Sequence, residues 1–209
     1  MALDISHVDP AHTAVVVNEC QRGVTGDLGF LKELVALSAP YMANIGRLVR
    51  AARPAGIQVV HCVVKGREDG KGSNTNSRIA GASRKARESG RGPAYTQDEF
   101  AKVHEAIGVE PEDVYLPRIH GMSPMSDTGL DPLLRNMGIT TIVAMGVSLN
   151  VGVTNFVMDA MNRSYNVVVP ADCCVGVPEE YGKAVLANTI ANIARLTTVD
   201  ELISLWSKA

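Results

Sequence analysis

Short apolar runs alternate with segments of helical spacing along the whole chain. The runs are rich in β-branched residues and hold few polar positions, which is typical of strands buried on both faces. They are TAVVVNEC (13–20), IQVVHCVV (57–64), VYLP (114–117), TTIVAMG (140–146) and NVVVPAD (166–172). We expect LTTV (196–199) to form a short sixth strand before the last helix.

The segments between these runs predict helices. Leu130, Leu133, Leu134 and Met137 share one helical face, and Gly138 follows as a C-terminal signal. The same spacing recurs at Val153, Phe156, Val157, Ala160 and Met161. Further helices are expected around 41–52, 97–107, 179–194 and 199–207. This alternation predicts a three-layer α/β/α fold of the Rossmann-like kind, with a doubly wound, mainly parallel sheet.

Length and charge narrow the class of protein. The chain has 209 residues, 46% of them hydrophobic and 20% charged, and a formal net charge of -2. One core is enough for this length, so residues 1–209 are predicted to form one domain. The charge favours neither nucleic acid nor a membrane as a partner. Because the first residues lack a basic head with an apolar run, and no segment approaches a membrane span, we expect a cytoplasmic protein.

The cysteines do not indicate a metal site or a disulfide framework. Cys20, Cys62, Cys173 and Cys174 form no C-x-x-C pair and no zinc-ligand spacing. Buried thiols in a reducing compartment are expected, with Cys20 on the opposite face of its strand from Glu19. No D-x-H-x-x-H cluster is present either, since VVHCVVKGRED supplies one histidine only, and we predict no metal and no cofactor.

In a doubly wound sheet, ligands bind beyond the carboxyl ends of the strands. The candidate site positions there are Glu19, His61, Lys65, Arg118, His120, the turn at 146–152 and Asp172. A histidine in such a place is either a substrate contact or a hydrogen-bonded structural residue.

The segment 65–96 is long and irregular. It carries eight Lys or Arg residues against three acids and is rich in Gly and Ser. Segments of this kind are lids, interface arms or solvated loops, and the sequence leaves these alternatives open. As a lid, it would let Lys65 and Arg67 attract an anionic substrate.

Three stretches resemble the isochorismatase-like hydrolase superfamily, also called the cysteine hydrolases. They are TAVVVNECQRGV, GMSPMSDTGLDPLLRNMGITT and VAMGVSLNVGVTNFVMDAMNRSYNVVVPADCCVG. The resemblance runs from about residue 12 to the end of the fifth apolar run. It implies the isochorismatase-like fold, a hydrolase acting on a small-molecule substrate, and assembly into a homodimer or homotetramer.

Members of that superfamily usually carry an aspartate, a lysine and a nucleophilic cysteine. The aspartate pattern D-x-Q falls on Glu19-Cys20-Gln21, so the acid is retained on a longer stem. The lysine position falls on Leu116 or Arg118 according to the anchor used, and we favour Arg118 because it keeps a cation beside the acid. Arginine binds a carboxylate through two N–H groups but does not exchange its proton near neutrality. The cysteine position falls on Gly152.

The resemblance therefore implies a site without its thioester-forming sulfur. The helix start at Ser148, Leu149 and Asn150 through Gly152 would still offer backbone N–H groups to an oxyanion. The family's non-proline cis peptide would be Val147–Ser148. Isochorismatases resemble this chain in holding glycine at the cysteine position, and they need only an acid.

Three hypotheses follow for the function. In the leading one, the protein is a hydrolase with Glu19 as general acid or base, Arg118 as substrate anchor and His61, Lys65 and His120 near the substrate. In the second, it is a catalytically silent homologue that binds a metabolite or a protein partner. In the third, Ser148 is the nucleophile of an amidase or esterase.

Overall fold

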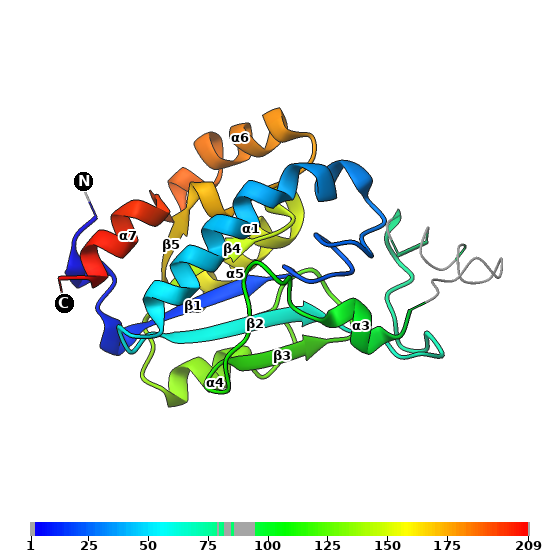
Figure 1. Cartoon of the computed structure of the whole chain (residues 1–209), viewed down its shortest axis with the longest axis horizontal. Helices are drawn as coiled ribbons and strands as arrows, with labels where there is room; N and C mark the ends of the chain where they lie inside the picture. Colours follow the sequence, from blue (N-terminus) through cyan, green and yellow to red (C-terminus); the bar gives the residue numbers. More distant parts are fainter. Residues whose placement is uncertain (1–2, 79, 82–84, 86–94, 209) are drawn as a thin grey trace.

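A single sheet of parallel strands organises the molecule (Figure 1). The computed structural model describes residues 3–78, 80–81, 85 and 95–208. The strands are β1 (Thr13–Asn18), β2 (Gln58–Val64), β3 (Val114–Arg118), β4 (Thr141–Gly146), β5 (Asn166–Pro170) and β6 (Arg195–Thr197). They lie in the order β3-β2-β1-β4-β5-β6, and each neighbouring pair is parallel. The predicted doubly wound sheet is confirmed.

Helices cover both faces of the sheet. They are α1 (Lys32–Ala52), α3 (Gln97–Ala101), α4 (Leu130–Asn136), α5 (Thr154–Asn162), α6 (Glu179–Asn188) and α7 (Val199–Trp206). The long helix α1 packs across β1, β2 and β4 and also contacts α7, in front of the sheet in Figure 1. Helix α5 contacts β4 and β5 from behind. The result is the expected three-layer arrangement.

Three helix boundaries differ from the prediction. Helix α1 begins at Lys32 rather than near residue 41 and keeps Pro40 inside it, because a continuous apolar stripe binds the helix to the core. Helix α3 ends at Ala101 rather than 107, where Lys102 turns to an extended ψ of 131°. Helix α6 ends at Asn188, and a 3-10 turn, Ile190–Asn192, completes the predicted segment.

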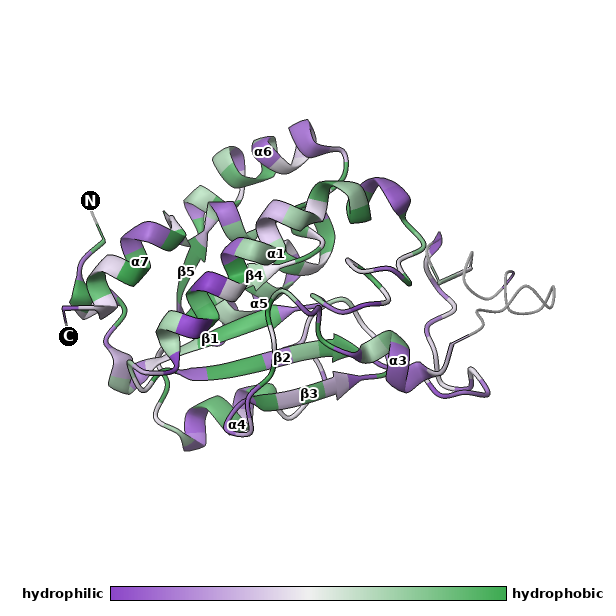
Figure 2. Cartoon of the chain, in the orientation of Figure 1, coloured by the Kyte–Doolittle hydropathy of each residue, from purple (hydrophilic) through white to green (hydrophobic). Residues whose placement is uncertain are grey.

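Burial along the strands follows their position in the sheet. Every residue of β1 and β4 is buried, as their unbroken apolar runs predict. Strand β3 lies at the edge, alternates between exposed and less exposed residues, and is correspondingly less hydrophobic in Figure 2. Pro117 is tolerated there because an edge strand can lack one N–H donor.

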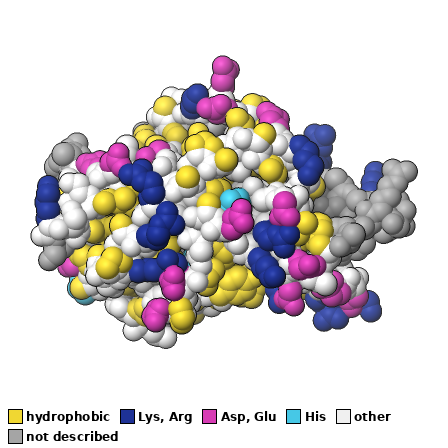
Figure 3. All heavy atoms as spheres, in the orientation of Figure 1, with side chains coloured by type: hydrophobic (Ala, Val, Ile, Leu, Met, Phe, Trp, Pro, Cys, Tyr) yellow, Lys and Arg dark blue, Asp and Glu magenta, His cyan; other side chains and the backbone are white. Residues whose placement is uncertain are grey.

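Charged side chains of both signs occur on the molecular surface around the outer face of α1. Basic, acidic and hydrophobic side chains are interspersed over this face in Figure 3, which agrees with the nearly balanced composition. In the part of the chain that the structure describes, none of the helices is both long and apolar enough to cross a membrane.

The strand order reverses at one definite point in the sheet. The chain runs outward from β1 to β2 and β3, and then from β4 to β5 and β6 in the other direction. Strands β1 and β4 are neighbours, with Asn18 opposite Gly146 at their carboxyl ends. A doubly wound sheet binds ligands at such a reversal. Functional side chains are therefore expected just after these two strands.

Candidate active site

Glu19 follows β1 directly and has an unusual backbone conformation. Its φ is 55°, in the left-handed region that residues other than glycine seldom adopt. Its N–H donates to Cys62 O at 2.8 Å. Two residues on, the Gln21 side chain donates to Val64 O at 2.8 Å and accepts from Val64 N at 2.7 Å. These hydrogen bonds to β2 hold the turn in place. Strained backbone conformations that the surrounding structure holds in this way are concentrated at functional sites.

Arg118 ends β3 and reaches the carboxylate of Glu19. Its Nη2 donates to Glu19 Oε1 and lies 3.4 Å from Met122 O. The Arg118 side chain is 3% exposed and that of Glu19 is 17% exposed. Of the two candidates for the family's lysine position, it is thus Arg118 and not Leu116 that contacts the Glu19 carboxylate. Its Nε and Nη1 are buried and have no hydrogen-bond partner within the described residues.

Burial dominates the proton affinity of Glu19. It raises the pKa of the Glu19 carboxyl, and the opposing effect of the Arg118 charge does not outweigh it. The carboxyl consequently keeps its proton to a higher pH than a free glutamate does. This direction is the one required for a residue that gives and takes a proton near neutrality.

Gly152 lies close to this ion pair. It belongs to a π-helical turn, Leu149–Val153, between β4 and α5, and the predicted cis peptide at Val147–Ser148 precedes that turn. A Cβ on Gly152 would be 3.1 Å from Asn18 Nδ2 and 3.5 Å from Met122 O. Since Met122 O also neighbours Arg118 Nη2, this carbonyl connects the glycine to the ion pair. The positions assigned to the cation and to the nucleophile therefore border the same carbonyl oxygen, and the acid is paired with that cation.

The backbone of the turn is less open than predicted. Leu149 N donates to Val175 O at 2.8 Å, and Val151 N donates to Ser148 O at 3.1 Å. The prediction of a row of free N–H groups for an oxyanion is therefore wrong for Leu149 and Val151, because a π-helical turn and a neighbouring loop use them.

The polar side chains of the turn bind one another. Ser148 Oγ donates to Asn150 Oδ1, and Asn150 Nδ2 donates to Val177 O at 2.9 Å. The Asn150 side chain is therefore held within this turn and by the loop at Val177. The hydroxyl of Ser148 contacts an amide oxygen instead of a base, so this geometry gives no support to a serine nucleophile.

His61 lies away from the site, so its predicted contact with substrate is wrong. Its Nε2 is 3.0 Å from Asp113 Oδ2, and its side chain is 1% exposed. Asp113, which precedes β3, also accepts from Arg53 Nη2 at 2.6 Å. This cluster lies where β3 begins, whereas Arg118 lies where it ends. Burial lowers the pKa of His61 even with Asp113 beside it.

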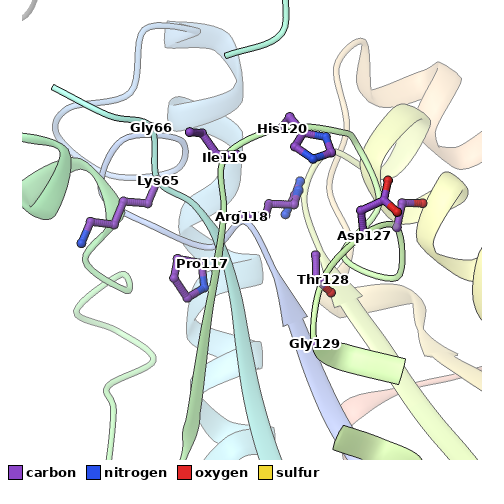
Figure 4. Close-up of a pocket in the computed structure, with 10 residues that line it drawn as sticks. Lys65, Gly66, Pro117, Arg118, Ile119, His120, Asp127, Thr128 and Gly129 are labelled. Atoms are coloured by element: carbon purple, nitrogen blue, oxygen red, sulfur yellow. The ribbon is translucent and has the colours of Figure 1, made fainter. Parts of the chain in front are cut away.

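A cavity of about 460 Å³ opens beside Arg118 (Figure 4). Arg118, His120 and Asp127 line it on one side of the β3 end, and Lys65 lies on the other side with its side chain pointing away from Arg118. The Lys65 ammonium forms an ion pair with Asp98. His120 is exposed at the rim. The volume suits a small molecule.

Other predicted residues take structural roles. Cys20 is 2% exposed, as expected of a core residue, and burial raises the pKa of its thiol. Both carboxylate oxygens of Asp172 accept from Val199 N, at 3.1 and 3.3 Å, at the start of α7. No group of three or more His, Cys, Asp or Glu in the described residues is placed to hold a metal. The expectations of no metal and no cofactor stay predictions.

Sequence reasoning missed Asn18. It is 0% exposed, and its Nδ2 donates to Val147 O at 2.7 Å across the β1–β4 reversal. The available signal was a single amide at the end of an otherwise apolar strand, directly before the acid.

Comparison with known proteins identifies the family. Residues 13–201 match the model described as the Isochorismatase domain. The chain belongs to the isochorismatase family of hydrolases. Its relatives include the ureidoacrylate amidohydrolase RutB of Methylobacterium radiotolerans, 32% identical over 87% of this chain and 74% of the relative. The RutB of Pseudomonas syringae pv. syringae is 28% identical over 95% of this chain and 85% of its own.

Solved structures of this family share the fold. A cysteine hydrolase from Pseudomonas syringae pv. phaseolicola superposes with a TM-score of 0.78, covering 100% of this chain and 98% of its own at 23% identity. An isochorismatase family protein from Burkholderia thailandensis gives a TM-score of 0.75 over 94% of this chain and 96% of its own, at 22% identity. At these identities the likeness concerns the fold alone.

Proposed function

We propose that this isochorismatase-family protein hydrolyses a small, anionic, carbonyl-bearing metabolite without a cysteine thioester, with Glu19 as general acid and base. The observation that carries the proposal is the largely buried Glu19–Arg118 pair, whose arginine shares the neighbouring carbonyl Met122 O with the Gly152 position. Relatives that act as ureidoacrylate amidohydrolases favour an amide or ureido carbonyl as the bond attacked.

Glu19 and Arg118 divide the chemistry between them. The raised pKa of Glu19 lets the carboxylate accept a proton and return it to a leaving group. Arg118 stays charged, orients the carboxylate and has further N–H groups for a substrate oxygen. Without a side chain at Gly152, the protein has no covalent nucleophile at this position, so a proton-transfer residue has to activate the reaction.

The adjoining cavity favours an anionic substrate. Arg118, Lys65 and His120 line it, with Asp127 as the single acid among its lining residues. Arg118 keeps Nε and Nη1 without a partner among the described residues, so the lining offers N–H donors to an anionic group. We therefore expect the substrate to carry a carboxylate besides the scissile carbonyl. A homodimer or homotetramer remains the expected assembly, with no nucleic acid or membrane as partner.

A substrate screen tests the proposal. Wild-type protein, Glu19→Gln and the exposed control Glu180→Gln would be assayed with ureido acids, amides, esters and vinyl ethers. We expect turnover by the wild type and by Glu180→Gln, and a loss of about 100-fold or more in kcat for Glu19→Gln. Turnover that is the same in all three proteins would refute the role of Glu19.

The second candidate is a catalytically silent binder of a metabolite or protein partner, and the glycine at position 152 is the observation that favours it. It predicts ligand-dependent thermal stabilisation with no turnover of any compound, because a ligand that binds only the folded state raises its apparent stability. Multiple turnover by purified protein would exclude it.

A further inference from the structure

Asn18 lies against the position that a side chain at residue 152 would occupy. A Cβ built on Gly152 would be 3.1 Å from Asn18 Nδ2 and 3.3 Å from Val147 O. Asn18 Nδ2 is itself fixed, because it donates to Val147 O at 2.7 Å. The carboxamide therefore borders the place where the family resemblance puts the nucleophile.

The other end of this carboxamide, Oδ1, has no partner among the residues that the structure describes. Asn18 Oδ1 is buried and accepts no hydrogen bond from the described residues. Buried amide oxygens are almost always paired with protein or with ordered water, because an unpaired one loses its solvation without replacement. The bond from Nδ2 to Val147 O determines which end is the oxygen, so the free group is an acceptor and needs an O–H or N–H donor.

The groups around Asn18 indicate which molecule supplies the missing donor. Glu19 is the next residue after Asn18 and supplies a carboxylate, while Arg118 contributes buried, unpartnered Nε and Nη1 groups. An amide oxygen without a donor, followed in the chain by a carboxylate that is paired with a cation, suits one water molecule. Such a water can donate one hydrogen to each acceptor and keep a lone pair for attack.

We propose that Asn18 positions a hydrolytic water beside the side-chain position of residue 152, through a hydrogen bond from that water to Asn18 Oδ1. This inference rests on the proposed hydrolase function. The water oxygen bonds to the substrate carbonyl carbon as one water proton passes to the Glu19 carboxylate. The tetrahedral intermediate then breaks its C–N bond, and the leaving nitrogen takes the proton from Glu19.

Crystal structures without ligand give a test that needs no activity. In the wild type, we expect an ordered solvent molecule within hydrogen-bond distance of both Asn18 Oδ1 and the Glu19 carboxylate. In Gly152→Ala, the new methyl group should displace it. A wild-type crystal structure with no solvent at Asn18 Oδ1 overturns the proposal.

Kinetics with ureidoacrylate and 3-ureidopropionate as probes test the role in catalysis. Asn18→Leu should lower kcat by about 100-fold with KM within about threefold, because the water loses its orientation and the substrate keeps its contacts. Intact-mass spectrometry of the quenched reaction should show no acyl-enzyme. Asn44→Leu is the matched control, since Asn44 Nδ2 also donates to a backbone carbonyl, Asp172 O, at 3.0 Å, and its kcat should be unchanged.

The variant Asn18→Asp distinguishes positioning of the water from a purely structural role of Asn18. Aspartate keeps an acceptor for the water but, when ionised, cannot donate to Val147 O. A positioning role predicts at least about tenfold more kcat in Asn18→Asp than in Asn18→Leu. If the two variants are equally impaired, Asn18 acts only by holding Val147. If the wild type turns over no probe, the proposed function fails; if it does, with Glu19 required but Asn18→Leu unaffected, only this inference fails.

Discussion

Two carboxylates, Asp113 buried and Glu19 partly buried, face arginines at opposite ends of the sheet, and their hydrogen-bond partners differ greatly in number. Asp113 accepts hydrogen bonds from Arg53 Nη2 at 2.6 Å and from Glu110 N at 2.9 Å, and His61 Nε2 is 3.0 Å away. Burial alone would raise the pKa of Asp113, but these bonds hold it below the ordinary value. Glu19 is bonded by one arginine nitrogen, and burial raises its pKa.

The difference separates a structural ion cluster from a reactive one. Asp113 is surrounded by donors that stabilise its charged form, so a change of protonation there opposes folding. Glu19 lacks such a group of donors and has a strained backbone. The groups of Arg118 and Asn18 without partners among the described residues belong to the same region. A carboxyl left in that state is available to a substrate and to a proton.

Removing the charge of Asp113 should have the largest effect on stability. Asp113→Asn leaves the Arg53 charge without its partner and turns an amide donor toward other donors, so we expect a loss of about 3 kcal/mol in the free energy of unfolding. Urea denaturation measures it. Asp27→Asn is the control, because Asp27 pairs with Arg22 on the surface, and its midpoint should hardly move. Equal losses in both variants would contradict the comparison.

Glu19→Gln should destabilise the protein less than Asp113→Asn does. Arg118 keeps an acceptor in the glutamine oxygen and loses only the opposite charge, while the burial penalty of the Glu19 charge disappears, so a change of no more than about 1 kcal/mol is expected. The same urea titrations compare the two variants directly. A greater loss at Glu19 than at Asp113 would mean that the Glu19–Arg118 pair is mainly structural.

The sheet was predictable because its signals are local. The apolar runs that became β1 and β4 are recognisable within a few residues, and strand alternation with helices then restricts the topology. Glu19 and Arg118 are 99 residues apart, yet parallel strands carry their last residues to one edge. Their pairing followed from this rule together with the family resemblance.

The errors arose where tertiary partners decide a residue's role. The sequence predicts His61 at a strand end, but it lies inside β2, and its partner Asp113 is 52 residues further along. The N–H groups of Leu149 and Val151 were expected to be free, since nothing local revealed the π-helical turn or the approach of Val175. Asn18 was missed because a lone amide at a strand end does not show its contacts.

The two clusters should also respond to pH with opposite signs. The folded-state pKa values of Asp113 and His61 are lowered, so their contributions are present above the ordinary values, 3.8 and 6.5, and are lost as pH falls through the folded-state values. Glu19 is the reverse: its raised pKa favours folding below 4.5, and this contribution is lost as pH rises through the folded-state value.

His61→Gln tests the acid-sensitive cluster. Glutamine keeps an N–H donor for Asp113 but does not titrate, so the fall in unfolding free energy below pH 6.5 should be shallower than in the wild type. Urea denaturation at a series of pH values measures the slope. His12→Gln, at an exposed histidine near Gly138, serves as the control. A slope unchanged in His61→Gln would show that His61 does not contribute.

The smallest effect on stability is expected at Lys65, whose partner is exposed instead of buried. The side chains of Lys65 and Asp98 are 37% and 77% exposed, so water and salt screen their attraction, and Lys65→Met should leave the denaturation midpoint unmoved. Lys65 nevertheless lines the cavity beside Arg118. For an anionic substrate, KM should rise by about two- to threefold at low salt and converge on the wild-type value at high salt, because only long-range attraction is lost. A KM increase that persists at high salt would instead indicate direct contact between Lys65 and the substrate, which would extend the reactive cluster beyond Glu19 and Arg118.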